Sequence, residues 1–277
     1  KKILNKRDFK IPFEYMPYKD FCNLSSKLQK KFVNLGKYNF KLRIEGLSKD
    51  LNSQNAFLNN KLISKKEMKE KLGIKNNNPI VFIYAHAWYD FPHCLDMSNF
   101  VNFYEWILFT YKTVLKIKDV NWIFKSHPLE EWYGKPNLRD IISSNFKNVY
   151  LVDQKINTFS SIKNSDCVVT VFGTVGIEAT ILGKPALICD KSYYQEWGIG
   201  THVKNLEQYK YILNNLSEVK SPSVKTKELA LAFFYFAFSP HEKEKNLINF
   251  VDDYDSVKVH KSFLNFSFEE YTHEHNE

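Results

Sequence analysis

The sequence predicts an α/β fold built on a parallel sheet with helices on both faces. From Pro79 onward, short apolar runs rich in β-branched residues alternate with segments whose apolar residues recur at helical spacing. Continuous apolar runs are typical of strands that are buried on both sides in a parallel sheet. A chain of 277 residues with 44% hydrophobic and 16% aromatic content can also enclose a large core.

Five strands and a series of helices are expected in alternation. The strands span Ile80–Ala85, Val120–Lys125, Val149–Val152, Cys167–Phe172 and Ala186–Cys189. The first crossover helix is predicted within residues 100–115, where the apolar residues share one helical face. Later helices are predicted at Leu138–Ser144, Thr158–Lys163, Val175–Leu182 and Leu206–Leu216, then from Pro222 to Phe238 and from His241 to Phe250. This βαβ alternation is that of a Rossmann-like domain.

Three regions are expected along the chain. Residues 1–76 form an N-terminal helical or linker segment, polar and without a strand series, which is interpreted as the remainder of a missing domain. Residues 77–240 form the Rossmann-like domain, which the Asn76–Pro79 turn introduces. Residues 241–277 form a C-terminal helix and tail. The first residue is lysine, so an excised N-terminal portion is considered.

Composition favours a cytoplasmic protein that meets anionic partners. No apolar run approaches the roughly 20 residues that a membrane-spanning helix needs. The four cysteines show no paired metal spacing, and Cys167 and Cys189 fall in expected buried strands, which fits a reducing compartment. The formal charge of +8 favours an anionic membrane surface or an anionic substrate over nucleic acid, because no nucleic-acid-binding signature accompanies the dispersed lysines.

The segment Phe172–Ala179 joins the fourth expected strand to the next helix. Its glycines permit tight turns, and the N–H groups at a helix start face an anion in many phosphate sites. The candidate phosphate contacts are Gly173, Thr174, Val175 and Gly176. Glu178 is a candidate to accept hydrogen bonds from ribose hydroxyls. The alternative is an ordinary turn that Thr174 caps, followed by a solvated helix carboxylate.

The second expected strand ends in Lys125-Ser126-His127-Pro128. Ligands of open parallel sheets bind beyond the carboxyl ends of the strands, so these side chains belong to the same edge as the glycine turn. His127 is a candidate to donate to a phosphate or a leaving group, and Lys125 to add positive charge. The alternative for His127 is a loop histidine with a local hydrogen bond.

The first expected strand is followed by a loop that carries His86, Asp90 and His93. His86 and Asp90 are candidate acid–base groups, with Asp90 either orienting His86 or removing a proton from an acceptor hydroxyl. A metal is the weaker interpretation, because the spacing is not that of a zinc site. After the fifth strand, the loop of residues 190–200 mixes aromatic and polar residues and suits a sugar or acceptor wall; its alternative is a long surface loop. The candidate wall residues are His93, Tyr193, Tyr194 and Glu196.

These motifs in this order resemble bacterial capsule and surface-polysaccharide biosynthesis proteins of the GT-B glycosyltransferase type. The resemblance rests on four segments and covers about residues 75 to 205. They are residues 85–93, Tyr104-Glu105-Trp106, Asn121–Pro128 and Gly173–Pro185. The His-Pro element is also similar to that of bacterial sialyltransferases and Kdo transferases. The resemblance implies that the chain is similar to the C-terminal, donor-binding domain of a GT-B enzyme, with His127 and Thr174 at the donor phosphate and Glu178 at the ribose.

The resemblance implies transfer of a sugar from a nucleotide-sugar donor, CMP-linked among the options, to a capsular or lipopolysaccharide acceptor. The expected partners are the nucleotide-sugar, a polysaccharide or glycolipid acceptor and the anionic inner membrane; no redox cofactor, metal or nucleic acid is expected. Gly173-Thr174 stands where some relatives have consecutive serines, which leaves the donor open. Two alternatives remain at this point: a teichoic-acid-type polyol-phosphate transferase, and a nucleotide-sugar-binding module without turnover.

Overall fold

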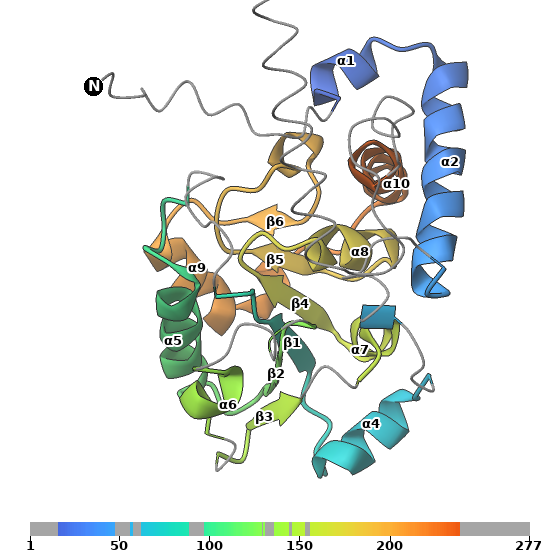
Figure 1. Cartoon of the computed structure of the whole chain (residues 1–277). Helices are drawn as coiled ribbons and strands as arrows, with labels where there is room; N and C mark the ends of the chain where they lie inside the picture. Colours follow the sequence, from blue (N-terminus) through green and yellow to red (C-terminus); the bar gives the residue numbers. More distant parts are fainter. Residues whose placement is uncertain are drawn as a thin grey trace, which may run out of the picture. The chain divides into compact units, whose positions relative to one another are not determined.

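A computed structural model describes residues 16–47, 56–57, 62–88, 97–128, 130, 136–143, 146–152 and 156–238 (Figure 1). The chain divides into two compact units, Lys1–Ala237 and Phe238–Glu277. Every element below lies in the first unit, apart from the last residue of the final helix. Among the described residues, no helix has both the length and the apolar character that crossing a bilayer requires.

A six-stranded parallel sheet forms the centre of this unit. Its strands are β1 (Ile80–Tyr84), β2 (Asn121–Lys125), β3 (Val149–Val152), β4 (Cys167–Thr170), β5 (Ala186–Ile188) and β6 (Thr201–His202). They lie in the order β3-β2-β1-β4-β5-β6, and every pair is parallel. This is the strand order of a doubly wound nucleotide-binding fold, in which the chain switches sides between β1 and β4. The predicted fold class is confirmed.

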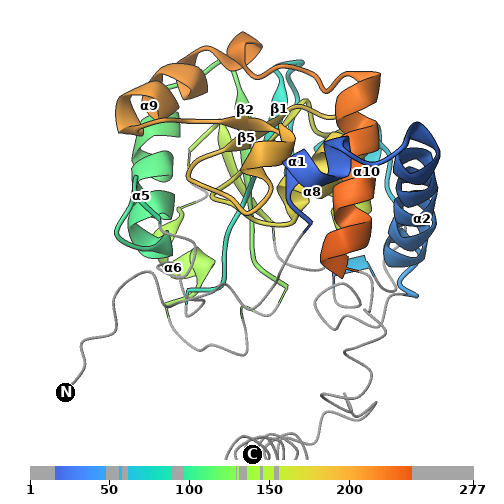
Figure 2. The ribbon, with the colours of Figure 1, turned by 90° about the horizontal axis from the view of Figure 1, so that it is seen from above.

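Helices cover both faces of the sheet. Figure 2 shows α5, α6 and α9 on one face, with α8 and α10 on the other. Their bounds are α5 (Phe103–Val114), α6 (Leu138–Ile141), α7 (Thr158–Asn164), α8 (Val175–Ile181), α9 (Leu206–Asn214) and α10 (Val224–Phe238), with 3₁₀ turns at Gln195–Trp197 and Leu216–Glu218. Since both faces are covered, every residue of β1, β2, β4 and β5 is buried. Cys167 and Cys189 are buried, as predicted.

The elements expected within the described residues are present, but several end earlier than the apolar pattern suggests. β4 stops at Thr170, because Val171 and Phe172 already belong to the bend before α8, although both are buried. The crossover helix starts at Phe103, where the side chain of Asn102 caps it by accepting from the Glu105 N–H at 2.8 Å. β6 was not predicted, because two half-buried residues carry no apolar run. The predicted helix from His241 to Phe250 lies outside the described residues.

Before the sheet, the described residues include α1 (Tyr18–Cys22), α2 (Ser26–Ile44) and α4 (Lys65–Leu72). A long helix, α2, packs on α10, and a Cβ built on Gly36 would lie 1.8 Å from the carbonyl oxygen of Leu231. Only glycine permits this approach of two backbones. Phe32 adds ring contacts to Tyr235 and Phe236 of α10. The boundaries expected at residues 76 and 240 stay predictions, while the described packing joins α2 to the helices of the sheet.

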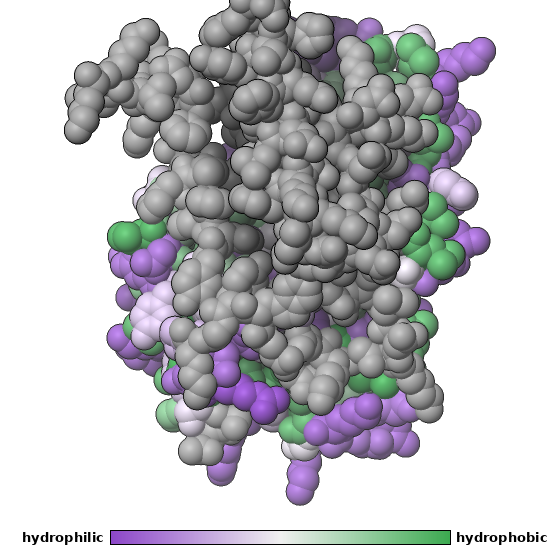
Figure 3. All heavy atoms as spheres, viewed as in Figure 1, coloured by the Kyte–Doolittle hydropathy of each residue, from purple (hydrophilic) through white to green (hydrophobic). Residues whose placement is uncertain are grey.

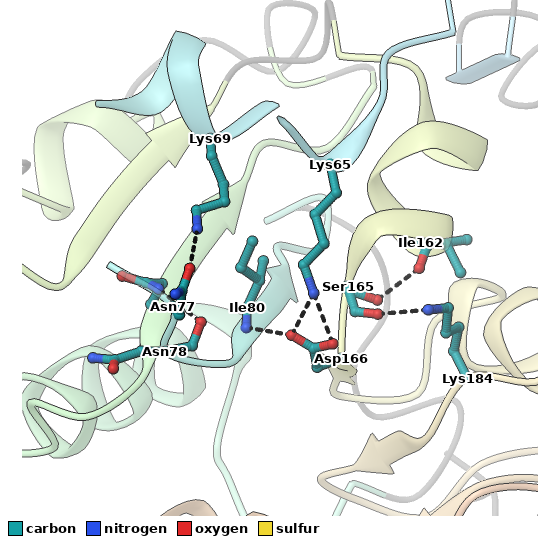
Figure 4. Close-up of polar contacts among 10 residues, drawn as sticks. Lys65, Lys69, Asn77, Asn78, Ile80, Ile162, Ser165, Asp166 and Lys184 are labelled. Atoms are coloured by element: carbon teal, nitrogen blue, oxygen red, sulfur yellow. Dashed lines mark hydrogen bonds and ion pairs between the residues drawn. The ribbon is translucent and has the colours of Figure 1, made fainter. Parts of the chain in front are cut away.

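The amino edge of the sheet is closed by α4 and polar side chains (Figure 4). The carboxylate of Asp166 accepts from the Ile80 N–H at 2.8 Å and from the Lys65 ammonium at 2.9 Å. Lys184 donates to the Ser165 carbonyl at 2.8 Å. The Asn78 N–H donates to the Asn76 side chain at 3.1 Å, which forms the predicted turn before β1.

Candidate functional site

Three of the predicted motifs meet at the carboxyl edge of the sheet. His86 follows β1, His127 follows β2, and the turn at Gly173 and Thr174 follows β4. β1 lies between β2 and β4 in the sheet, so the three strand ends are neighbours. The gap between β1 and β4 is also where the strand order reverses, which is where doubly wound folds bind their ligands.

The two histidines lie face to face at this edge. Their ring centroids are 6.1 Å apart with an interplanar angle of 21°. The ring of His86 also stacks on Phe103 at 4.1 Å and meets Phe172 edge-on at 5.1 Å. Phe103 opens α5 and Phe172 precedes the glycine turn, so His86 joins the β1, β4 and α5 segments. Both histidines are partly exposed as residues, although Nδ1 of His86 is buried.

The glycine turn is compact and hydrogen-bonded within itself. The Gly173 N–H donates to the Thr170 hydroxyl at 3.1 Å, and the Gly176 N–H donates to the Gly173 carbonyl at 3.0 Å. Thr174 occupies the position before α8, yet its side chain makes no capping hydrogen bond. The alternative in which Thr174 caps the helix through its hydroxyl is therefore wrong. Thr174 is half-buried and Val175 is buried, and α8 begins at Val175 at the carboxyl edge of the sheet.

The glycines serve close packing rather than an unusual backbone angle. Neither Gly173 nor Gly176 has a positive φ among the glycines of the described segments. A Cβ on Gly176 would lie 2.6 Å from the Tyr194 hydroxyl and 2.7 Å from Cδ1 of Ile188, and one on Gly173 would lie 2.8 Å from the Thr170 hydroxyl. The turn can therefore sit directly on β5 and on the loop that follows it.

Glu178 lies in the first turn of α8 but not in solvent. Its carboxylate is 2.8 Å from Nε of Arg43, and the two side chains are 3% and 6% exposed. The alternative of a solvated helix carboxylate is wrong. The contact to ribose stays a prediction. In such a contact, the carboxylate would bind the ribose hydroxyls while it is also paired with Arg43 of α2.

Lys125 ends β2 with its side chain buried. Its ammonium donates to the Ile156 carbonyl at 2.6 Å, just before α7. The residue is 2% exposed. The structure thus brings the Lys125 charge to the segment between β3 and α7, and a contact to a donor stays a prediction.

The predicted wall residues divide into three groups. Tyr194 is fully buried, and its hydroxyl donates to the Gly173 carbonyl at 3.0 Å. Tyr193 is half-buried with its ring against Tyr194 and Phe233, whereas Glu196 is exposed in the 3₁₀ turn. Asp90 and His93 lie outside the described residues, so the proposed base and that part of the wall stay predictions.

Two buried charged residues of this region were not predicted. Asp190 follows β5, and its carboxylate accepts from the N–H groups of Ser98, Asn99 and Lys191 at 2.8 to 3.2 Å. It thereby fixes the segment that returns from the loop after β1. Arg43 is the other, and the sequence held a signal for it: it is one of three arginines among 39 basic residues. Arginine is the basic residue best suited to a buried ion pair.

Burial also shifts several ionisation equilibria near the site. It lowers the pKa of His202 to about 4, and Nε2 of this histidine lies 2.7 Å from the Ser192 hydroxyl. Burial raises the pKa of Tyr84 and of Tyr194, and the negative charge of Glu178 raises both further. Within the described segments, no group of three or more His, Cys, Asp or Glu side chains is arranged to hold a metal ion; the expectation of a metal-free site stays a prediction.

Several solved structures are similar to this chain. A β-Kdo 2,4-transferase, KpsC of Thermosulfurimonas dismutans, is 15% identical with a TM-score of 0.48 over 76% of this chain and 56% of its own. The wall teichoic acid polymerase TagF is 17% identical with a TM-score of 0.40 over 73% and 47%. The spinosyn rhamnosyltransferase SpnG is 11% identical with a TM-score of 0.37 over 58% and 41%. The chain thus spans about half the length of these proteins.

A family match covers the centre of the chain. No protein with a curated description matches it in sequence. Residues 101–220 match the family described as capsule polysaccharide biosynthesis protein. This segment includes His127, the glycine turn and Tyr194, whereas His86 and Arg43 precede it. The resemblance to capsule polysaccharide biosynthesis proteins that the motifs predict is therefore confirmed over the segment from α5 to α9.

Proposed function

We propose that this chain is the donor-binding part of a GT-B-type glycosyltransferase, which transfers a sugar from a nucleotide donor to a capsular or lipopolysaccharide acceptor. One observation carries the proposal: His86, His127 and the turn at Gly173 meet at the point where the strand order of a doubly wound sheet reverses. Ligands of such sheets bind in this crevice. The match of residues 101–220 to capsule biosynthesis proteins supports the acceptor class.

In this proposal His127 and the Thr174 hydroxyl contact the donor phosphate. As the bond from sugar to phosphate breaks, negative charge grows on the departing nucleotide, and hydrogen bonds from fixed donors stabilise that charge. His86 is well placed to steady the ring of His127, since the two stack with Phe103 behind them. A base, for which Asp90 is the candidate, removes the proton of the acceptor hydroxyl. The proposal needs no redox cofactor.

The first test is a thermal-shift panel of CMP, CDP, UDP and GDP on the full chain. A ligand that binds only the folded state raises Tm. At a concentration of a hundred times its Kd, it adds about 2.7 kcal/mol to the free energy of unfolding. One nucleotide is expected to stabilise the chain selectively, and a CMP response favours a CMP-linked donor. His127→Ala is expected to abolish the shift, whereas Asn77→Ala, exposed at the opposite edge of the sheet, is the matched control. Equal shifts in both variants would remove His127 from the site.

Product analysis separates this proposal from its alternatives. Glycosidic linkages formed from a nucleotide-sugar support it, and loss of transfer in His127→Ala with residual nucleotide binding supports the assigned role. Phosphodiester products indicate a polyol-phosphate transferase instead. Nucleotide binding without transfer by the longest natural form of the chain indicates a binding module.

We also propose that α2 brings the enzyme to the anionic inner membrane. Five exposed lysines lie on the side of α2 opposite its buried face, and the helix contains no acidic residue. They are Lys27, Lys30, Lys31, Lys37 and Lys41. Figure 3 shows hydrophilic side chains, interspersed with hydrophobic ones, along the edge where α2 lies. Tyr38 is 59% exposed on the same face. Each lysine near an anionic bilayer contributes about 1 kcal/mol to the free energy of membrane binding.

Vesicle sedimentation tests the membrane contact. The chain is expected to sediment with vesicles that contain phosphatidylglycerol, less so at high salt, and not with pure phosphatidylcholine vesicles. Replacing Lys27, Lys30 and Lys37 by glutamine is expected to abolish sedimentation. The control replaces Lys66, Lys69 and Lys71 of α4, a helix whose charges include Glu67 and Glu70. If both triple variants sediment equally, α2 is not the contact surface.

A further inference from the structure

A buried ion pair links the N-terminal helix α2 to the glycine turn segment. Nε of Arg43 lies 2.8 Å from Oε1 of Glu178, across 135 residues of sequence. The side chains are 6% and 3% exposed. Removing two charges from water is costly, so a buried pair is weak evidence of a purely stabilising role. Its position one helical turn after Gly173 and Thr174 calls for another explanation.

Arg43 is held in place by more than its charge. Its guanidinium carbon lies 5.7 Å from the ring centres of both Phe57 and Phe234. Cations over aromatic faces are attracted to the ring, and the two rings limit the movement of a planar guanidinium. The arginine therefore offers Glu178 a fixed partner rather than a mobile one.

Glu178 in turn lies close to the crevice of the sheet. Its negative charge raises the pKa of Tyr84, at the end of β1, and of Tyr194, which bonds the glycine turn, in each case after the larger effect of burial. The Glu178 N–H also donates to the Thr174 carbonyl at 3.1 Å, so the residue lies one helical turn beyond the glycine turn. Because only 3% of its side chain is exposed, its orientation decides whether a ribose hydroxyl can reach it.

We infer that Arg43 is a positioning residue of the donor site: it fixes the Glu178 carboxylate in the orientation that accepts the ribose hydroxyls. The inference rests on the proposed function and extends the site to α2, outside the segment that matches the capsule family. A carboxylate accepts about four hydrogen bonds, so an arginine at Oε1 and a ribose hydroxyl are compatible partners. The affinity for a ligand whose ribose binds Glu178 then depends on Arg43, which the ligand does not contact.

The test compares a ribonucleotide with its 2′,3′-dideoxy analogue by calorimetric titration of the full chain. The nucleotide is the one that stabilises the chain most in the thermal-shift panel. The wild-type chain is expected to bind the ribonucleotide about tenfold more tightly, the typical effect of a hydrogen bond to a charged group. Glu178→Gln is expected to bring the ratio of the two affinities, ribonucleotide over dideoxy analogue, close to one. Arg43→Met and Arg43→Lys are expected to lower the ratio at least about threefold, with little change for the dideoxy analogue, whose phosphate contacts remain.

Two comparisons make the result specific. Arg43→Lys keeps the charge and so guards against a simple failure to fold, which the unpaired Glu178 in Arg43→Met risks. Lys41→Met removes a lysine of the same helix that makes an exposed ion pair with Glu45, and it is expected to leave the ratio unchanged. A general packing defect would weaken both nucleotides equally and would leave the ratio at the wild-type value.

The failures are distinct from one another. A folded Arg43→Lys chain with the wild-type ratio overturns the role of Arg43 while the donor site stands. If Glu178→Gln keeps the wild-type ratio of ribonucleotide to dideoxynucleotide affinity, Glu178 does not contact the ribose and Arg43 has no carboxylate to position there. Nucleotide binding through the phosphate still stands in that case. If the wild-type chain binds no nucleotide, the proposed function itself fails, and this inference with it.

Discussion

The hydroxyl of Tyr194 donates a hydrogen bond of 3.0 Å to the carbonyl of Gly173. The bond joins the loop after β5 to the turn after β4, two segments that are 21 residues apart. Tyr194 is completely buried, and the ring packs against His202 and Phe233. The shape of the glycine turn therefore depends on a side chain that the sequence places in a separate loop.

Tyr194→Phe is expected to destabilise the chain by about 1 to 2 kcal/mol, because it leaves the Gly173 carbonyl without this donor while it keeps the ring. The change is read from urea denaturation. If the turn contacts the donor phosphate, nucleotide affinity falls as well. The matched control is the neighbouring Tyr193→Phe, whose ring is half-buried. An equal loss of stability in both variants would show that the Tyr194–Gly173 bond carries no special weight.

Gly176→Ala is expected to destabilise the chain by about 1 to 3 kcal/mol, the usual cost of one methyl group too many in a packed interior. The new Cβ would lie 2.6 Å from the Tyr194 hydroxyl and 2.7 Å from Cδ1 of Ile188. Denaturant titration measures the loss.

The double variant Gly176→Ala/Tyr194→Phe locates the cause. Removing the hydroxyl relieves one of the two clashes, so the double variant is expected to lose less than the sum of the single losses. Strict additivity would show that the added methyl group is not limited by the Tyr194 hydroxyl.

The sequence predicts the sheet well because each fully buried strand contains a continuous apolar run. Ile80–Tyr84 and Cys167–Thr170 are recognisable from their own residues, and the parallel arrangement follows from the helices between them. The end of a strand is less well marked, since Val171 and Phe172 remain buried after the ladder has ended. A two-residue edge strand such as Thr201–His202 has no pattern to detect.

The candidate site is predictable only where it is local in sequence. His86, His127 and the glycine turn each follow a strand, so the topology places them together. Arg43 pairs with Glu178 across 135 residues, and the Asp190 carboxylate meets Ser98 across 92. Such pairs depend on how α2 and the returning loop pack, which periodicity does not encode. The role of Gly176 was missed for the same reason, because its neighbour Tyr194 lies in another loop.

Asp190→Asn is expected to destabilise the chain by at least about 2 kcal/mol, because one amide oxygen replaces a charged carboxylate that accepts from several N–H groups, and its own N–H₂ group faces them. The residue is completely buried, and its oxygens lie 2.8 Å from the N–H groups of Asn99 and Lys191.

The matched control for this loss is Asp166→Asn. That carboxylate is 43% exposed, and it meets Lys65 and one backbone N–H at the opposite edge of the sheet. A smaller loss is expected there, because water competes for the exposed groups. Thermal melts of both variants give the comparison. If Asp190→Asn is as stable as the wild-type chain, the carboxylate does not hold the segment of Ser98 and Asn99.

His202 is expected to make stability depend on pH between about 4 and 6.5. Burial lowers the pKa of the folded-state imidazole from 6.5 to about 4. In this window the unfolded chain binds the proton and the folded chain does not, so acidification favours unfolding. The contribution of neutral His202 is complete above pH 6.5, falls as the pH drops, and levels off below about pH 4. The total change is on the order of 3 kcal/mol.

The comparison with His202→Gln isolates this effect from the titration of the carboxylates. Glutamine does not titrate, and it can keep a hydrogen bond to the Ser192 hydroxyl, which lies 2.7 Å from Nε2 of the histidine. The difference in unfolding free energy between the two chains is expected to shift in favour of the variant as the pH falls from 6.5 to 4. Urea titrations at half-unit intervals of pH measure it. Parallel pH profiles would mean that His202 is protonated in the folded chain as readily as in the unfolded one, and that the Ser192 contact does not depend on a neutral ring.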